Sequence, residues 1–237
     1  MTHSLVLYSK NRTQGTSSEG TLKLNHHING RYELLEFCMT DGLYNVTNLN
    51  NKIYISVNGG GTQTLSLPLG HYSGSKLATE VATLLSTLSG STFTCSYGST
   101  TGKMTISETT GDTFSLTYGT NTLNTARYLL GFDEVDTTAS TSIVSVNVCD
   151  LSPDKVIYMG FDEDTERNIQ GSELFATLLL SMEGEFGKVM RYKSSQHYSQ
   201  VMRFTNTPAM LNYRFFNEEF EGVDLNGVEW VMLLRKL

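Results

Sequence analysis

Short segments that alternate between apolar and polar residues, separated by turn residues, run through most of this chain and constrain its fold more than any other feature. In "KIYISVN" (52–58), Ile53, Ile55 and Val57 recur at every second position, which is typical of a half-buried strand. "FTCSYG", "GKMTISE" and "DTFSLTYG" alternate in the same way between Gly-containing turns. Roughly ten to twelve such segments predict a β-sandwich or β-barrel.

The strand-like segments become longer and more apolar after residue 142. They are "SIVSVNV", "KVIYMGF", "ELFATLLLSME", "KVMRYKS", "QVMRFTN", "MLNYRFFNE" and the final "VEWVMLLRKL". Aromatic residues on these segments, among them Tyr213 and Trp230, are expected to pack in the core or at an interface. The apolar final segment predicts that the C-terminus is built into the core, so that truncating it unfolds the protein.

Composition agrees with an all-β protein. Hydrophobic residues make up 39% and charged residues 17% of 237 residues, and Thr, Ser, Asn and 21 Gly fill the difference. This length allows either one large sandwich or two small domains. Residues 1–30 are polar and predict an N-terminal arm or lead-in, with the folded part beginning at residue 31.

One amphipathic helix is expected within residues 72–89, followed by a second, shorter helix within 124–132. Ser73 or Ser75 can cap the first helix, and Gly90 follows its end. Its apolar stripe consists of Leu77, Val81, Leu84, Leu85 and Leu88. We expect Leu77, Val81, Leu84 and Leu88 to be buried, and Lys76 and Glu80 to face water as an i,i+4 pair. In the second helix, Gly131 is expected in the left-handed conformation, with Phe132 folded back on the last turn.

Charge and hydropathy argue against contact with nucleic acid or a membrane. The net charge is −7, the pI is about 5.2, and Lys10 and Arg12 are the basic residues of the first twenty. A nucleic-acid-binding surface needs a basic patch, which the sequence lacks. The longest apolar run, "LFATLLL" (174–180), is too short to span a bilayer, and the first residues lack the apolar core of a signal peptide. We therefore expect a soluble protein.

The three cysteines, Cys38, Cys95 and Cys149, are odd in number and far apart. This suits a reducing compartment and predicts neither a disulfide framework nor a zinc site. We expect them to be small buried hydrophobic residues on strands.

Candidate residues for catalysis or metal binding are few, and each has a simpler structural interpretation. The five histidines are His3, His26, His27, His71 and His197, and none of their spacings matches a metal motif. His26-His27 could bind a metal, but a solvated turn is the simpler interpretation.

Acidic residues offer no stronger candidate. Asp162, Asp164 and Glu166 alternate like calcium ligands, but the loop lacks the Gly and Glu of a calcium-binding loop, so a solvated turn is favoured. A glycosidase-like carboxylate pair could be formed by Glu183 with Glu185, or by Glu218 with Glu219, yet no motif singles out these residues.

The glycine-rich "NGGGTQ" (58–63) lacks the Lys-Ser/Thr of a phosphate loop and predicts a hairpin tip. No nucleophile motif is present. The sequence predicts no enzyme, no cofactor and no metal.

Three features in order resemble a known family over residues 52–133. They are "LSLPLGHYSGSKLATEVATLLSTL", "FTCSYGSTTGKMTIS" and the "LLGF" that closes a short helix after "DTFSLTYG". Together they resemble the penton (vertex) and minor capsid proteins of virophages, polinton-like viruses, adintoviruses and related large double-stranded DNA viruses.

The resemblance implies one jelly-roll antiparallel β-sandwich over residues 31–237, with a helical insertion near 72–89. This chain departs from some relatives in that it is expected to have no room for a large insertion domain. The resemblance further implies a homopentamer at the five-fold vertices of an icosahedral capsid. Its partners would be the surrounding major capsid subunits and internal minor capsid proteins, and it would be assembled in the host cell and located in the virion. Two alternatives stay open: a carbohydrate- or receptor-binding β-sandwich, such as a fibre or lectin-like module, and a minor capsid cement protein.

Overall fold

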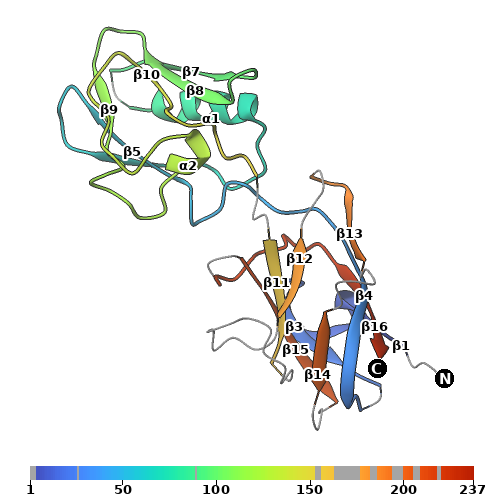
Figure 1. The fold of residues 1–237 in the computed structure, drawn as a ribbon. Coiled ribbons are helices and arrows are strands. Elements are labelled where there is room, and N and C mark those ends of the chain that lie inside the picture. The colour runs from blue at the N-terminus through green and yellow to red at the C-terminus, as the bar shows by residue number, and fades with distance from the viewer. Residues whose placement is uncertain are drawn as a thin grey trace. The chain divides into compact units, whose positions relative to one another are not determined.

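The computed structural model describes residues 4–25, 27–88, 90–152, 156–162, 177–181, 186–193, 200–204, 209–217 and 220–237. It divides the chain into two compact units (Figure 1). Unit 1 consists of Met1–Leu43 and Asp154–Leu237, and unit 2 of Tyr44–Pro153. The expectation of a single domain over 31–237 with a short helical insertion is therefore wrong, because the inserted segment is large enough to bury a hydrophobic core of its own.

Unit 1 is a sandwich of two five-stranded sheets in which all strand pairs are antiparallel. The first sheet has the order β1 (Ser4–Tyr8), β16 (Trp230–Lys236), β4 (Gly30–Thr40) and β13 (Val189–Lys193), with β14 (Val201–Phe204) also pairing with β4. The second has the order β12 (Thr177–Ser181), β11 (Val156–Phe161), β15 (Met210–Phe216), β3 (Glu19–Lys23) and β2 (Arg12–Gly15). The chain passes back and forth between the sheets, and the all-β jelly-roll sandwich is confirmed in unit 1.

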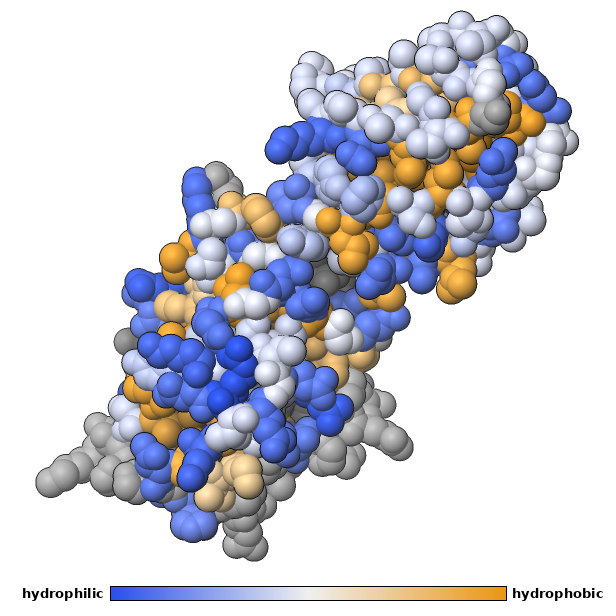
Figure 2. Space-filling view, turned by 180° about the vertical axis from the view of Figure 1, so that it is seen from behind, coloured by the Kyte–Doolittle hydropathy of each residue, from blue (hydrophilic) through white to orange (hydrophobic). Residues whose placement is uncertain are grey.

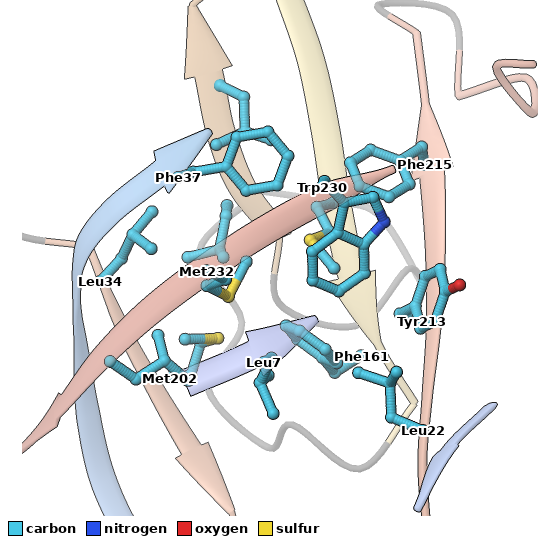
Figure 3. Close-up of a cluster of buried hydrophobic side chains, with 14 of the residues drawn as sticks. Leu7, Leu22, Leu34, Phe37, Phe161, Met202, Tyr213, Phe215, Trp230 and Met232 are labelled. Atoms are coloured by element: carbon cyan, nitrogen blue, oxygen red, sulfur yellow. The ribbon is translucent and has the colours of Figure 1, made fainter. Parts of the chain in front are cut away.

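The core of unit 1 is centred on Trp230, which is 1% exposed (Figure 3). Its ring stacks on Phe37 at a centroid distance of 5.9 Å and meets Tyr213 edge-to-face at 4.9 Å. Met232 and Leu234 follow on the same buried face of β16, which lies between β1 and β4. The prediction that the final strand belongs to the core is confirmed.

The described residues of the 1–30 segment are not an arm. They form β1, a 3₁₀ turn (Ser9–Asn11), β2 and β3, which all belong to the sandwich. The Trp230 indole N–H donates to the Ser17 carbonyl at 2.9 Å, and the Tyr213 hydroxyl donates to the Thr16 carbonyl at 2.6 Å. The segment is polar in composition, yet it is held both by these hydrogen bonds to the C-terminal strands and by Leu7, Leu22, Leu24 and Ile28, which are buried in the core.

Unit 2 packs two three-stranded sheets and two short helices around a second core. One sheet has the order β10 (Ser142–Val144), β8 (Lys103–Glu108) and β7 (Phe93–Gly98). The other has the order β6 (Gln63–Ser66), β5 (Lys52–Val57) and β9 (Phe114–Leu116). The helices are α1 (Gly74–Leu85) and α2 (Arg127–Leu130).

Helix α1 buries most of the stripe that the sequence predicts. Ser73 caps it by accepting from the Lys76 N–H, and Leu77, Val81 and Leu85 are fully buried, with Leu88 nearly so. Lys76 is exposed and Glu80 partly exposed. Leu84 is only half-buried at the margin of the core, so its predicted burial is not complete.

The helix also ends about one turn earlier than expected. The Ser86 hydroxyl accepts from the Phe93 N–H at 3.1 Å and donates to the Phe93 carbonyl at 3.3 Å. These two bonds tie the end of the helix to the first residue of β7.

The end of α2 matches the prediction. Gly131 is left-handed (φ 79°), its N–H donates to the Tyr128 carbonyl at 3.0 Å, and the Phe132 N–H donates to the Arg127 carbonyl at 2.7 Å. These two bonds are those of a Schellman motif.

Candidate interaction surfaces

The sequence-predicted chemical candidates do not gather into a site within the described residues. No group of three or more His, Cys, Asp or Glu side chains in that part of the chain could hold a metal ion. His27 is exposed in unit 1, and His71 is half-buried in unit 2. The other candidates lie outside the described residues; they are His3, His26, His197, Asp164, Glu166, Glu183, Glu185, Glu218 and Glu219. The 58–63 loop is the predicted hairpin tip between β5 and β6, with Asn58 and Gly59 at positive φ.

Asp162 borders a polar groove of about 480 Å³ on unit 1, between the β2–β3 hairpin and β15. Arg214 crosses this groove, 3.3 Å from a Glu19 oxygen and 3.7 Å from an Asp162 oxygen. All three side chains are substantially exposed, and such ion pairs contribute little to stability. Two carboxylates share one guanidinium here, so these three side chains carry a net charge of −1 and are all in contact with water.

The outer face of the first unit 1 sheet carries an apolar strip along its β1 edge. Val6 (43% exposed) lies opposite the half-buried Leu233, and Tyr8 (37%) lies opposite Val231 (36%). We call these four residues the outer strip. The Lys10 ammonium lies 5.4 Å from the centre of the Tyr8 ring. Apolar side chains exposed together on an edge strand are typical of surfaces that contact another protein.

The sequence interpretation missed the outer strip because it assigned residues 1–30 to an arm. The alternation in "SLVLY" is the signal that could have revealed it, since Leu5 and Leu7 turn toward the core while Val6 and Tyr8 turn outward. In Figure 2, apolar residues interrupt the hydrophilic surface of both units.

The three cysteines are free thiols and are half-buried rather than fully buried. Cys38 and Cys95 lie on strands as expected, but Cys149 follows β10 in a connecting segment. Burial raises the pKa of Cys95 to about 12 and that of Cys149 to about 11. Both thiols are therefore protonated at neutral pH and are poor nucleophiles.

No helix in the described ranges is long and apolar enough to cross a membrane.

Comparison with known proteins gives a likeness of fold only. No protein-family model matches the chain, and no curated protein matches it. The chain is similar to the crystal structure of the selenomethionine-labelled mavirus penton protein, with a TM-score of 0.54 and 10% sequence identity. The similarity covers 99% of this chain and 99% of that chain. The shared fold therefore extends over both units, whereas the sequences have little in common.

Proposed function

We propose that this chain is a structural protein of an icosahedral double-stranded DNA virus capsid, in which five copies form the vertex. The observation that carries the proposal is the full-length likeness of fold to a viral penton protein. A jelly roll alone is shared by many functions, but a match that includes the inserted unit is more specific.

The composition and the described surface support a structural role. The acidic balance suits a shell protein that does not touch the genome directly. In this proposal the protein is not an enzyme, and it acts by contacting its own copies, the surrounding major capsid subunits and internal minor capsid proteins within the virion.

The outer strip is our candidate for part of the contact between copies in the pentamer. A ring of five is built from heterologous contacts, in which one surface meets a different surface of the next copy. The outer strip supplies an apolar surface of the kind that such a contact buries.

The test is the mass of the purified full chain in solution, measured by light scattering after size-exclusion chromatography. The proposal predicts five times the chain mass of 26.3 kDa. Val6→Glu should dissociate the pentamer into monomers that keep the far-UV circular dichroism spectrum of the folded chain, because Val6 is already partly exposed. Met210→Glu, a matched change at an exposed apolar residue of the other sheet, should leave the pentamer intact.

A trimer would favour a fibre protein, and a monomer that binds glycans would contradict the vertex role. A wild-type pentamer that survives Val6→Glu would remove only the assignment of the outer strip.

A further inference from the structure

Strand β1 forms one edge of the first unit 1 sheet and pairs with β16 on its inner side (Figure 1). The register is regular over all five residues of β1, without a bulge. The N–H and C=O groups of successive residues in a strand point to opposite sides, so only every second residue of β1 can bond to β16. The other residues direct these groups away from the sheet.

Hydrogen bonds at the two ends of β16 show which residues these are. The Trp230 N–H donates to the hydroxyl of Ser9, the residue that follows β1, at 2.7 Å. The Leu237 N–H donates to the carbonyl of Arg31, a residue of β4, at 3.0 Å. Even-numbered residues of β16 therefore direct their N–H and C=O groups toward β1, and odd-numbered residues direct them toward β4.

In this register Leu5 and Leu7, which lie opposite even-numbered residues of β16, bond to that strand. Ser4, Val6 and Tyr8 direct their N–H and C=O groups outward. Within the described residues these outward groups have no hydrogen-bond partner. Strand β1 thus presents an open edge of alternating donors and acceptors that is about 17 Å long at about 3.4 Å per residue.

The other edge strands of unit 1 carry features that hinder pairing, and β1 does not. The side-chain amide of Gln200 donates to the Leu179 carbonyl of β12 at 2.7 Å and accepts from the Leu179 N–H at 2.5 Å, so it occupies that edge. Strand β2 begins with Arg12 and has an irregular register, and β13 and β14 contain arginine. Residues 4–8 contain neither a charged residue nor a proline. Natural edge strands normally have such protection unless another strand pairs with them.

We propose that β1 binds an extended segment of another protein, which adds to the five-stranded sheet as a sixth strand. On one face this segment lies beside Val6 and Tyr8 of the outer strip, and on the other beside the half-buried Leu5, so apolar and β-branched residues fit its centre. Lys10 lies two residues beyond β1, and Lys236 follows the residue opposite the start of β1. Both lysines are exposed, and neither forms an ion pair within the described residues. The matching segment therefore has acidic residues at its ends.

The same charges argue against a second copy of this chain at the edge. Antiparallel pairing of β1 with β1 of another copy brings Lys10 of each copy toward Lys236 of the other, and like charges repel. Such a contact is also two-fold, so it closes a dimer and cannot build a ring.

The proposal concerns the backbone edge of β1 and does not depend on the vertex role. The probe is the synthetic peptide acetyl-Glu-Glu-Val-Thr-Ile-Thr-Val-Glu-Glu-amide carrying a fluorophore, titrated with the full chain and followed by anisotropy. A peptide with Lys in place of every Glu is the charge control. It should bind at least about threefold more weakly, with the difference shrinking at high salt.

Val6→Pro and Val6→Ala separate strand addition from general apolar adhesion. Both variants lose the valine side chain, but only proline removes the outward N–H, and the bonds from Leu5 and Leu7 to β16 are kept. Val6→Pro should bind the peptide at least about fivefold more weakly than Val6→Ala. If Val6→Pro loses the circular dichroism spectrum of the folded chain, Ser4→Pro and Ser4→Ala replace the pair, because proline is tolerated at the first residue of a strand.

Equal binding by the proline and alanine variants would overturn the proposal, as would no binding of the Glu-ended peptide at millimolar concentration. A solution mass that falls in Val6→Pro but not in Val6→Ala would show that a second copy pairs with the edge, and would also overturn it. The vertex role fails on a different result, a wild-type chain that is not a pentamer.

Discussion

Replacing Trp230 by Phe tests whether the N-terminal segment is part of the folded unit. Trp230 is 1% exposed, and its indole N–H is bonded to the carbonyl of Ser17, which is also 1% exposed. Phe keeps an aromatic ring against Phe37 but removes the donor, so the Ser17 carbonyl loses this partner in a buried position.

The expected cost follows from two contributions. Leaving a buried acceptor unsatisfied costs about 1–3 kcal/mol. The smaller ring leaves a cavity that adds about 1 kcal/mol. The total of about 2–4 kcal/mol is a large part of the roughly 5–15 kcal/mol that stabilises a typical domain.

The assay is urea unfolding followed by far-UV circular dichroism, since the variant removes the single tryptophan of the chain. Tyr213→Phe is the matched control, because the Tyr213 hydroxyl donates to the carbonyl of the neighbouring Thr16, an exposed residue. That carbonyl can bond to water, so the control should cost only about 0.5–1.5 kcal/mol.

The reasoning is refuted if Trp230→Phe costs less than the control. It is also refuted if deleting residues 1–17 leaves the urea midpoint of the wild type unchanged, because the segment would then be a detachable arm.

Three further predictions concern unit 2. Leu77→Ala, at a fully buried position of α1, should destabilise this unit by about 2–5 kcal/mol. The unfolding midpoint of unit 1, followed by Trp230 fluorescence, should stay unchanged, and a shift of that midpoint would contradict separate cores. Burial opposes ionisation of Glu108, but hydrogen bonds from the Thr110 hydroxyl and backbone N–H groups outweigh it and lower its pKa from 4.5 to about 2. The stabilisation by ionised Glu108 is thus present above about pH 4.5 and lost as the pH falls toward 2. Glu108→Gln should therefore make the melting temperature less dependent on pH across that range. A pH dependence equal to that of the wild type would be evidence against these hydrogen bonds. Cys95 and Cys149 should resist iodoacetamide at pH 8 until urea is added, as mass spectrometry would show; rapid labelling of the folded chain would contradict their raised pKa values.

Local features of the fold could be predicted from the sequence because their causes are local. The Ser73 cap depends on residues within one or two turns of each other, and so does the left-handed Gly131. The alternation of Ile53 and Ile55 likewise reports burial on one face of a strand. The same kind of signal gave the β-rich fold class and the buried final strand.

The errors arose where distant residues decide the structure. The bonds from Trp230 and Tyr213 to residues 16 and 17 join parts of the chain about two hundred residues apart, so local polarity suggested an arm. Periodicity shows that a side chain is buried but not which core it enters, and the two separate cores were therefore read as one. The outer strip depends on strand order, which short-range patterns do not contain.

A reconstruction of the virion that contains this chain would test the vertex role most directly. The proposal predicts five copies of the jelly-roll unit around each five-fold axis, in contact with the surrounding major capsid subunits. Density for this chain elsewhere, beneath the shell or on a projecting fibre, with another protein at the five-fold axis, would contradict it.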